Sequence, residues 1–399
     1  MLLLGYAEIV SGQLDVSSSA AGGAIGSRSR IRSLDGLRGL AALVVVIHHA
    51  LLAVPVLAAP YFGHGPVPGE DVLAWSLVHT PLHLFWGGSE AVYIFFVLSG
   101  LVLVLPVMRS GFSWLAYYPG RVVRLYLPTL GIVILGYASM YLVNRQPAPG
   151  LSEWLIDRAG QPTQATALKD VTLLTGASGL ISPLWSLQWE LLFSMLLPLF
   201  FACAVVVRRL VLTKVLLLVG FAAVGALLES PPLFYMPIFG FGVLLALELD
   251  RVRAWSARLR APGWVALSAA SLLALSAYWL ALAIWPEQIL LLRICKVLAV
   301  FGAIGTVLLV AFNGPSSRLF ERRSLQWLGK ISFSLYLVHE PIVVAVGYVV
   351  GAGAGWFVLP ISLVLSLVAA GGFFWLIERP GHRLARSCSA RFTPVSFKS

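Results

Sequence analysis

Residues 34–50 read LDGLRGLAALVVVIHHA, an apolar run with an arginine near its start and two histidines at its end. A helix needs about 20 mainly apolar residues to cross a bilayer. This run reaches that length when it is extended to residue 56, and nine later stretches do the same. The ten predicted spans are 37–56, 83–106, 126–143, 184–206, 211–228, 233–249, 264–284, 288–312, 332–351 and 356–377. They predict an all-α polytopic membrane protein.

Composition and charge support this prediction. Apolar residues make up 59% of the 399 positions and charged residues only 11%, whereas a soluble chain carries about 25% charged residues. The net charge of +11 does not indicate nucleic-acid binding, because the basic residues stand in short clusters between apolar runs. With a cytoplasmic N-terminus, 23 of the 28 Lys and Arg residues fall in cytoplasmic segments. The positive-inside rule therefore predicts that both termini are cytoplasmic.

The chain divides into three predicted parts. Residues 1–33 are rich in Ser, Ala and Gly and predict a disordered cytoplasmic arm, while 387–399 predict a short cytoplasmic tail. Residues 34–386 form the membrane domain. Two of its outside segments, near 57–82 and 144–183, are long and polar, and we interpret them as lid or acceptor-side loops.

Arg38 and His49 stand eleven residues apart on the first predicted span. On a helix this spacing is about 16 Å and returns to within about 20° of the same face, whereas His48 points about 80° away. An arginine grips phosphates and a near-neutral histidine takes a proton from a hydroxyl, so the pair suits a phosphate-bearing substrate. Alternatively, Arg38 is a topology anchor and His49 a hydrogen-bonding residue between helices.

Other polar residues in the predicted spans are candidates because burying them in lipid is costly. Glu190 lies six to seven residues from the outer end of the fourth span, close to Trp185, which is either a site residue or part of an interfacial aromatic belt. His339 stands beside Glu340 and a proline, either at a functional site or in a structural network at a kink.

Further candidates stand in and after the second span. Glu90 lies near its outer mouth and Ser99 is deeper, where small residues most often serve close helix packing. Arg121 and Arg124 are predicted just before the third span, as topology anchors or as phosphate ligands. No zinc motif, Walker loop, nucleophile elbow or dinucleotide fingerprint occurs, so we expect no metal and no permanently bound cofactor.

Taken in order, several segments resemble the acyltransferase-3 family of bacterial integral-membrane O-acyltransferases. The segments run across residues 34–386 and read LDGLRGLAALVVVIHHA (34–50), EAVYIFFVLSG (90–100), YYPGRVVRLYLP (117–128), LWSLQWELLF (184–193), LGKISFSLYLVHEPI (328–342) and IERPGHRLAR (377–386). Each segment alone is weak, but the match in this order is specific. The chain ends soon after its tenth predicted span, so we expect no appended periplasmic domain.

The resemblance assigns roles to residues of this chain. In the family's pattern, an arginine is followed after ten intervening residues by a histidine, and these positions fall on Arg38 and His49. The pattern implies that His49 is a general base and that Arg38 and Glu190 are further catalytic residues. The family's basic pair falls on Arg121 and Arg124, which implies donor binding. Second-rank positions are His339, Trp185, Glu90 and Ser99. Many members carry an acid where this chain has Tyr93, and Glu90 is the nearest acid that could replace it.

What the resemblance implies is O-acyl transfer, commonly acetyl transfer, in a bacterial inner membrane. The expected donor is cytoplasmic acyl-CoA, with acetyl-CoA as its expected form, and the acceptor is a hydroxyl of a glycan, a lipid-linked sugar or a related small molecule. Membrane lipids are the other expected partners, and nucleic acid is not. Two alternatives remain: a transporter or flippase with an intramembrane His and Glu relay, and a structural or sensory subunit.

Overall fold

The computed structural model describes residues 31–206 and 210–392, and this part of the chain is helical with no strand. The first described helix, α2, begins at Arg32, so the membrane domain starts two residues before the predicted boundary at 34. Residues 1–30 of the predicted arm and residues 393–399 of the predicted tail lie outside the described residues. So do residues 207–209, between α9 and α10.

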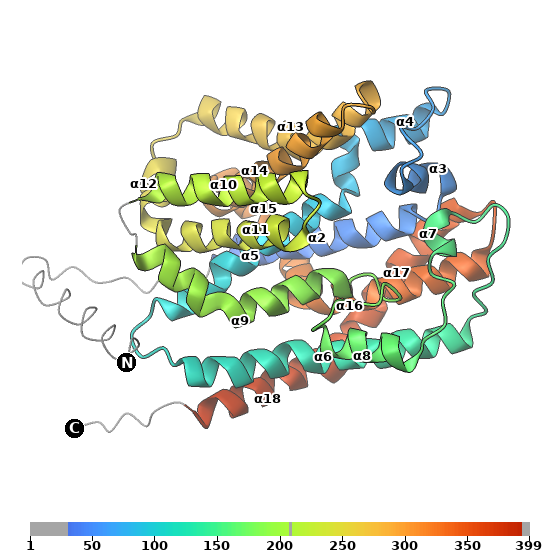
Figure 1. Cartoon of the computed structure of the whole chain (residues 1–399). Coiled ribbons are helices and arrows are strands. Elements are labelled where there is room, and N and C mark those ends of the chain that lie inside the picture. The colour runs from blue at the N-terminus through green and yellow to red at the C-terminus, as the bar shows by residue number, and fades with distance from the viewer. Residues whose placement is uncertain (1–30, 207–209, 393–399) are drawn as a thin grey trace, which may run out of the picture. The chain divides into compact units, whose positions relative to one another are not determined.

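Each of the ten predicted spans falls on a helix (Figure 1). Eight helical runs in the described residues are long and apolar enough to cross a bilayer, and a pair bent by 74°, α11 with α12, supplies a ninth. The remaining predicted span falls on α10, an apolar helix that is shorter, at 17 residues. The ten helices that coincide with predicted spans are α2 (Arg32–Leu51), α5 (Gly88–Val107), α6 (Trp114–Leu142), α9 (Leu184–Val206), α10 (Val211–Leu227), α11 (Pro231–Leu247), α13 (Ala261–Ile284), α14 (Ile289–Phe312), α16 (Arg323–Val350) and α17 (Gly355–Phe373). The predicted all-α membrane fold is confirmed.

Two helix ends differ from the prediction and change the site. Helix α6 begins at Trp114 rather than near 126, because the Ser113 hydroxyl accepts a hydrogen bond from Ala116 N and caps the helix there. Arg121 and Arg124 therefore lie inside this helix rather than before it. Helix α2 ends at Leu51 rather than near 56, because Pro55 cannot continue a helix and opens the next one. His49 therefore stands in the last turn of α2, not midway along it.

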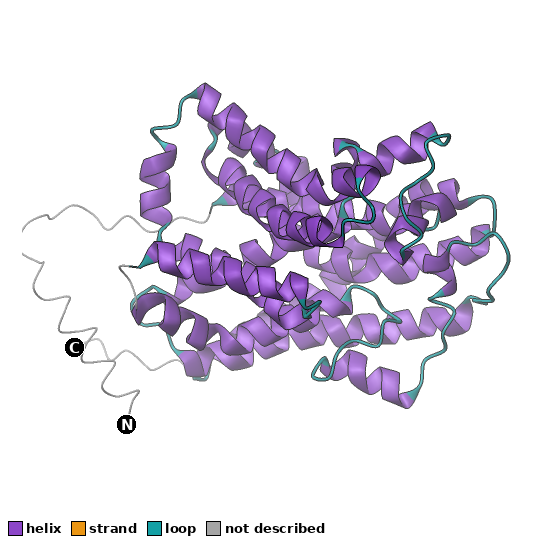
Figure 2. Cartoon of the chain, turned by 45° about the horizontal axis from the view of Figure 1, so that its top comes forward, coloured by secondary structure: helices purple, strands orange, loops and turns teal. Residues whose placement is uncertain are grey.

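Short helices gather at the two ends of the bundle (Figures 1 and 2). The loop end carries α3 (Pro55–Ala58), η1 (Ala59–Phe62), α4 (Val72–His79), η2 (Pro81–Phe85), α7 (Glu153–Ile156) and α8 (Gln164–Thr172). The opposite end, which we call the arginine-rich end, carries α12 (Leu249–Ser256), α15 (Gly314–Phe320), and α18 (Arg379–Ala390), which follows α17 through the π-turn η3 (Phe374–Glu378). The two long predicted outside segments thus form folded caps at one end. We call residues 52–87, between α2 and α5, the first cap, and residues 143–183, between α6 and α9, the second cap.

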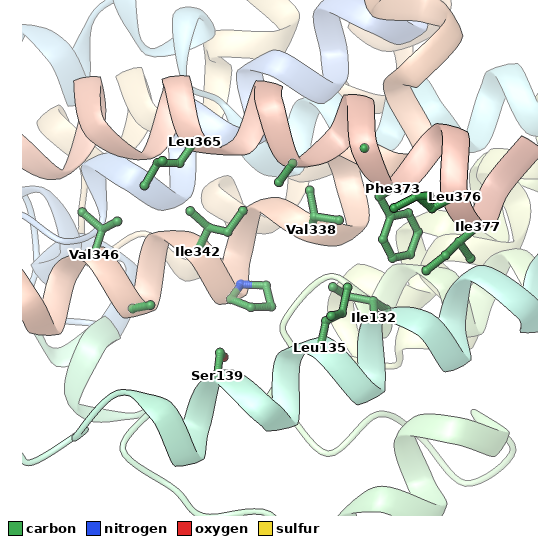
Figure 3. A pocket seen from close by; sticks show the side chains of 14 residues that line it. Ile132, Leu135, Ser139, Val338, Ile342, Val346, Leu365, Phe373, Leu376 and Ile377 are labelled. Carbon is green, nitrogen blue, oxygen red and sulfur yellow. The ribbon is translucent and has the colours of Figure 1, made fainter.

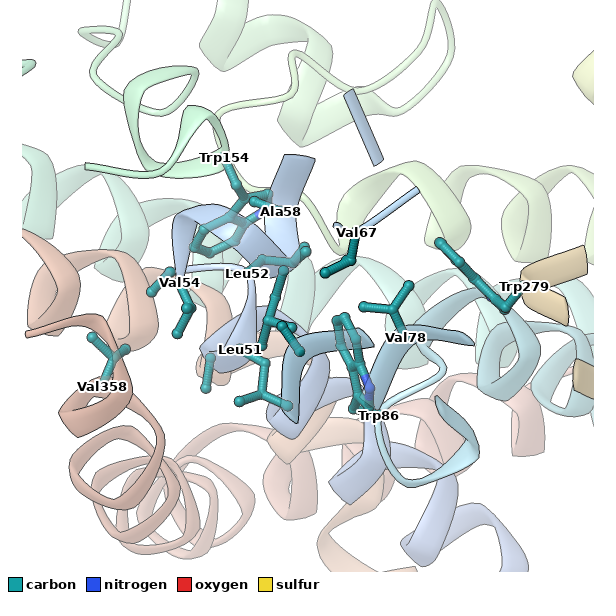
Figure 4. Packing of buried hydrophobic residues seen from close by; sticks show 14 of the residues in the cluster. Leu51, Leu52, Val54, Ala58, Val67, Val78, Trp86, Trp154, Trp279 and Val358 are labelled. Carbon is teal, nitrogen blue, oxygen red and sulfur yellow. The ribbon is translucent and has the colours of Figure 1, made fainter. Parts of the chain in front are cut away.

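These caps are packed against the helix ends rather than extended into solvent. A cluster of buried apolar residues joins α2 to the first cap through Leu51 and Trp86, to the second cap through Trp154, and to α13 through Trp279 (Figure 4). All four side chains are buried. The last turn of α2, which holds both His48 and His49, is therefore enclosed by protein on the side of the loop end.

Helices α2 and α16 approach each other closely because glycines meet at their contact. A Cβ atom added to Gly39 would lie 2.4 Å from the backbone nitrogen of Gly329, and one added to Gly329 would lie 2.2 Å from the Asp35 carbonyl oxygen. Small residues let helix backbones touch in membranes, where packing replaces the hydrophobic effect as the driving force. The glycine contact holds α2 at a fixed distance from α16 along its length.

We predict that Gly39→Val destabilises the protein, because the new side chain must push the backbone of α16 away. Overpacking of this kind costs about 1–3 kcal/mol. The matched control is Gly220→Val in α10, where an added Cβ meets nothing within 4 Å. The measurement is the thermal midpoint of each purified variant in detergent. Equal midpoints for the two variants would contradict the close packing of α2 on α16.

Candidate active site

The most distinctive polar contact of the bundle joins two histidines from α2 and α16. His49 Nδ1 lies 2.7 Å from His339 Nε2, and the two rings are nearly parallel, with 5.0 Å between their centroids. Both side chains are buried. The predicted first-rank and second-rank histidines, 290 residues apart in the sequence, thus form one dyad.

The remaining contact of His339 decides where the protons lie. His339 Nδ1 is 3.1 Å from the Leu335 carbonyl oxygen, which can only accept, so Nδ1 carries the hydrogen. Burial without a charged partner favours neutral rings. Neutral His339 must then accept at Nε2 from His49 Nδ1–H. His49 is left with an unprotonated Nε2, which is the form that a general base needs.

A segment of the second cap covers His49. The indole of Trp154, on α7, stacks on the His49 ring at 5.5 Å between centroids. The Arg158 guanidinium lies 4.3 Å from the indole centroid, and its Nε donates to Glu340 on α16 over 2.9 Å. The Tyr348 hydroxyl, also on α16, donates to the Leu155 carbonyl oxygen. The same helix that bears His339 therefore anchors the cap over His49.

His48 belongs to a different cluster, as its predicted direction requires. Its Nδ1 donates to the Trp86 carbonyl oxygen over 2.9 Å, and its ring packs against Tyr61. Trp279 completes this group and donates from its indole nitrogen to Glu90 over 3.1 Å. Glu90 is buried against Trp279 in this aromatic cluster and is not part of the dyad.

A second polar group lies deeper in the bundle, between α6 and α9. Arg121 donates from Nη2 to Glu190 over 2.6 Å and from Nε to the Ser194 hydroxyl over 2.9 Å. Arg121 is buried, and Glu190 keeps 26% of its side chain exposed. Glu190, which the sequence predicts in the outer third of the bilayer, and Arg121, which it predicts at the cytoplasmic surface, are therefore in contact. They meet because α6 begins earlier than expected and carries Arg121 two turns inside the helix.

Arg38 and Arg124 extend this group towards the arginine-rich end. The charge of Arg124 lies within electrostatic range of Arg38, Arg121 and Glu378. Glu378 in η3 accepts from the Ser334 hydroxyl and backbone nitrogen, which ties the C-terminal helical run to α16. Arg124 is exposed and makes no hydrogen bond or ion pair with another described side chain. It is the arginine of this group that is best placed to bind a phosphate.

The remaining second-rank residues, Trp185 and Ser99, lie in contacts between helices. Trp185 lies against Tyr235 at 5.2 Å between ring centroids. Ser99 precedes Gly100, where an added Cβ would lie 2.1 Å from the Phe239 carbonyl oxygen of α11, so this stretch allows α5 and α11 to touch. Tyr336 bonds through its hydroxyl to Ser186 over 2.6 Å and joins the fourth predicted span to α16.

Sequence reasoning missed two residues of the site, Trp154 and Arg158. Both come from a loop without apolar periodicity, so no helical face could be assigned to them. One signal was present: Arg158 is one of only three basic residues in the segments predicted outside, with Arg145 and Lys169. In the described part of the chain, no three His, Cys, Asp or Glu side chains converge as metal ligands would.

Comparisons with known proteins identify the class of this enzyme. The model of the acyltransferase-3 family, described as an acyltransferase domain, matches residues 31–377, and the chain belongs to this family. It is similar to O-acetyltransferase PaAT-1 from Phomopsis amygdali, with 30% identity over 383 residues that cover 80% of this chain and 73% of that protein. Acyltransferase MdmB from Streptomyces mycarofaciens is 26% identical over 390 residues, covering 89% of this chain and 92% of that protein. No solved structure matches significantly. The chain is an acyl-transferring enzyme of the membrane.

The dyad geometry predicts that His339 acts through His49. His339→Leu leaves the His49 Nδ1–H without a partner, which costs about 1–3 kcal/mol and corresponds to about a 5- to 150-fold lower kcat. His339→Gln should retain more activity, because its amide oxygen can accept from the same N–H. The measurement is kcat and KM for acyl transfer by each purified variant. A defect confined to KM, or equal loss in both variants, would show that His339 does not orient the base.

Proposed function

We propose that the protein transfers an acyl group from acyl-CoA to the hydroxyl of a second substrate, with His49 as the general base. The observation that supports this most is the bond from His49 Nδ1 to His339, which leaves His49 Nε2 free to accept a proton. Acetyl is the acyl group we propose, in line with the printed name of the relative O-acetyltransferase PaAT-1.

In the proposed step, the acceptor oxygen attacks the thioester carbonyl carbon as its proton passes to His49 Nε2. The C–S bond of the resulting tetrahedral intermediate then breaks, the acyl group stays on the acceptor oxygen, and the departing sulfur takes the proton back from His49. The imidazole thus acts as base and then as acid, which contributes typically 10²–10⁴-fold in rate. His339 holds the tautomer, and Trp154 keeps water from the ring by stacking on it.

The donor is proposed to enter from the arginine-rich end, where Arg38 and Arg124 would bind the phosphates of coenzyme A. Helix α2 connects this end to the dyad, because Arg38 and His49 are about 16 Å apart on one face. The residues between them on that face, Ala42 and Val45, are buried. An extended pantetheine arm can bridge this length once α2 and its neighbours separate locally to admit it.

The acceptor is proposed to approach from the loop end, where the caps lie over His49. We propose a glycan, a lipid-linked sugar or a smaller hydroxylated molecule as the acceptor, and polysaccharide modification by O-acetylation as one use of the reaction. The proposed location is a bacterial inner membrane with the arginine-rich end in the cytoplasm. The basic residues support this orientation, since the predicted outside segments contain only Arg145, Arg158 and Lys169.

We predict that His49→Ala abolishes acyl transfer while the protein remains folded and inserted. Loss of a general base lowers the rate by about 10²–10⁴-fold, which an endpoint assay detects. The neighbouring variant His48→Ala is the matched control, because His48 meets the His49 ring edge-on at 5.1 Å between centroids but makes its hydrogen bond to the Trp86 carbonyl oxygen rather than to the dyad. The measurement is transfer from radiolabelled acetyl-CoA by equal amounts of membrane-inserted protein. Full activity in His49→Ala, or a larger defect in His48→Ala, would refute the assignment.

We predict that Arg124→Ala weakens acyl-CoA binding without lowering stability. The substitution removes no hydrogen bond or ion pair with a described side chain, because Arg124 makes none. A charge-assisted hydrogen bond contributes about 1.5–3 kcal/mol, so Kd should rise by about 10- to 150-fold, and Lys should rescue part of the loss. Arg121→Ala should also lower the thermal midpoint, because it leaves Glu190 without its cation.

The control for both arginine variants is Arg109→Ala, which removes an exposed charge at the same end of the bundle. Binding is measured by calorimetric titration of detergent-solubilised protein with acetyl-CoA. Parent-like affinity in Arg124→Ala would mean that this arginine is a topology anchor, and the donor site would then lie elsewhere.

A further inference from the structure

A long apolar groove runs between α6, α16 and α17, and Figure 3 shows the side chains that line it. Its volume is about 580 Å³. Its walls are built by side chains one or two turns apart on each helix, such as Val338 and Ile342 on α16 and Ile132 and Leu135 on α6. Ser139, the last lining residue along α6, contributes the only polar side chain among the fourteen that line the groove.

The groove opens sideways to the surface of the bundle that meets lipid. Leu135 is 50% exposed, Leu365 47% and Leu376 79%, and all three lie at the groove in membrane-spanning helical runs. The lined part of the last helical run, from Leu365 in α17 to Ile377 in η3, extends over twelve residue steps, about 18 Å at 1.5 Å per residue. A dry, elongated and laterally open space in a bilayer is filled by a hydrocarbon chain, since water has no partners there.

The polar end of the groove carries a buried cation. Arg145, just beyond the end of α6, donates from Nη2 to the Ser139 hydroxyl over 2.8 Å. Its side chain is only 2% exposed, and its Nε has no hydrogen-bond partner. Burial lowers the pKa of Arg145, but a guanidinium remains protonated at any ordinary pH. A buried charge with an unused donor is costly unless an anion joins it.

The acids near Arg145 make their ion pairs with another residue, Arg158. Glu340 is the buried carboxylate within electrostatic range, and it is already paired with Arg158 over 2.9 Å. The second oxygen of Glu340 also lacks a hydrogen-bond partner. Asp170, a buried acid of the second cap, accepts hydrogen bonds from Tyr137 and from Ser178. Arg158 also pairs with the exposed Asp157 over 3.3 Å, so Glu340 and Asp157 both contact Arg158, and no ion pair joins Arg145 to an acid of the described residues.

This cation links the groove to the dyad. Arg145 lies within electrostatic range of Arg158, Arg158 covers the Trp154 indole, and Trp154 stacks on His49. A molecule with its chain in the groove and its anionic group at Arg145 therefore has its next atoms at the loop end, where the cap meets the dyad. An amphiphile of this kind can present a hydroxyl beyond its anionic group to His49.

We propose that this groove, closed at its polar end by Arg145, binds an alkyl phosphate lipid, with the hydrocarbon chain between α6, α16 and α17 and the phosphate at the Arg145 guanidinium. On the basis of the proposed function, this lipid is the acceptor, and the hydroxyl to be acylated belongs to the group attached to its phosphate. The two claims, lipid binding and acceptor identity, are tested by separate measurements.

Binding is tested with dodecyl phosphate that carries a diazirine near the end of its chain, added to the full chain in detergent. After irradiation, labelled peptides should map to residues 132–139 and 365–377, and excess unlabelled dodecyl phosphate should remove the label. Gly372→Leu should lose about tenfold or more of the labelling, because Gly372 lines the groove and the new side chain fills it. Gly371→Leu is the matched control, since an added Cβ meets nothing within 4 Å at either position and Gly371 does not line the groove.

The phosphate contact is tested in the same assay. Arg145→Gln should lower labelling by about tenfold, because charge-assisted hydrogen bonds are the strong ones. Lys169→Gln, which removes an exposed charge from the same cap, should leave it unchanged. Thermal midpoints establish that each variant is folded, and Arg145→Lys should label at an intermediate level. Equal labelling by the diazirine analogue of dodecanol, or labelling that ignores both Gly372→Leu and Arg145→Gln, would overturn the proposal.

The acceptor role is tested with membranes that contain the full chain, radiolabelled acetyl-CoA and a lipid extract of the source cells. Label should appear in material that butanol extracts and an anion exchanger retains, and Gly372→Leu should lose this product while Gly371→Leu keeps it. Hydrolysis of acetyl-CoA without acceptor should be equal in both variants. Label found only in water-soluble or neutral products would overturn the acceptor claim. If the parent protein does not use acetyl-CoA, the proposed function is overturned instead. Photolabelling would still decide whether the groove binds the lipid.

Discussion

The close contact between α2 and α16 is the constraint on which the site depends. Gly39 and Gly329 let the two backbones touch, and no side chain can be inserted there without separating the helices. The His49 to His339 hydrogen bond forms ten residues further along both helices, where an error of one ångström would break it. Packing of the smallest residues thus sets the position of the most chemically active ones.

Burial in a bilayer explains why polar residues far apart in the sequence meet in pairs. A charge in lipid must find a partner inside the protein, so each ionisable side chain also selects which helices are neighbours. Arg121 with Glu190 joins α6 to α9, and Arg158 with Glu340 joins the second cap to α16. Ion pairs of this kind fix which helices and caps are neighbours, because separating either pair would leave a buried charge without its partner.

Helix α16 contacts several different parts of the protein, because residues on its different faces point to different neighbours. Gly329 contacts α2, His339 contacts His49, and Glu340 pairs with Arg158 of the second cap, while Val338 and Ile342 line the groove. The 100° step between successive residues directs neighbours such as Val338, His339 and Glu340 to separate surroundings. Three consecutive residues therefore contact the lipid-facing groove, the dyad and the loop end.

The sequence by itself determined the ten helices and the faces of the first one. Apolar run length decides which segments enter lipid, and the helical repeat separates His49 from His48 without any tertiary information. The sequence did not place Trp154 over His49 or join Glu190 to Arg121. The path of a loop has no period that can be extrapolated, and the depth of a side chain depends on where its helix begins. Only the tertiary structure decided these contacts, because they arise from the packing of segments that share no local signal.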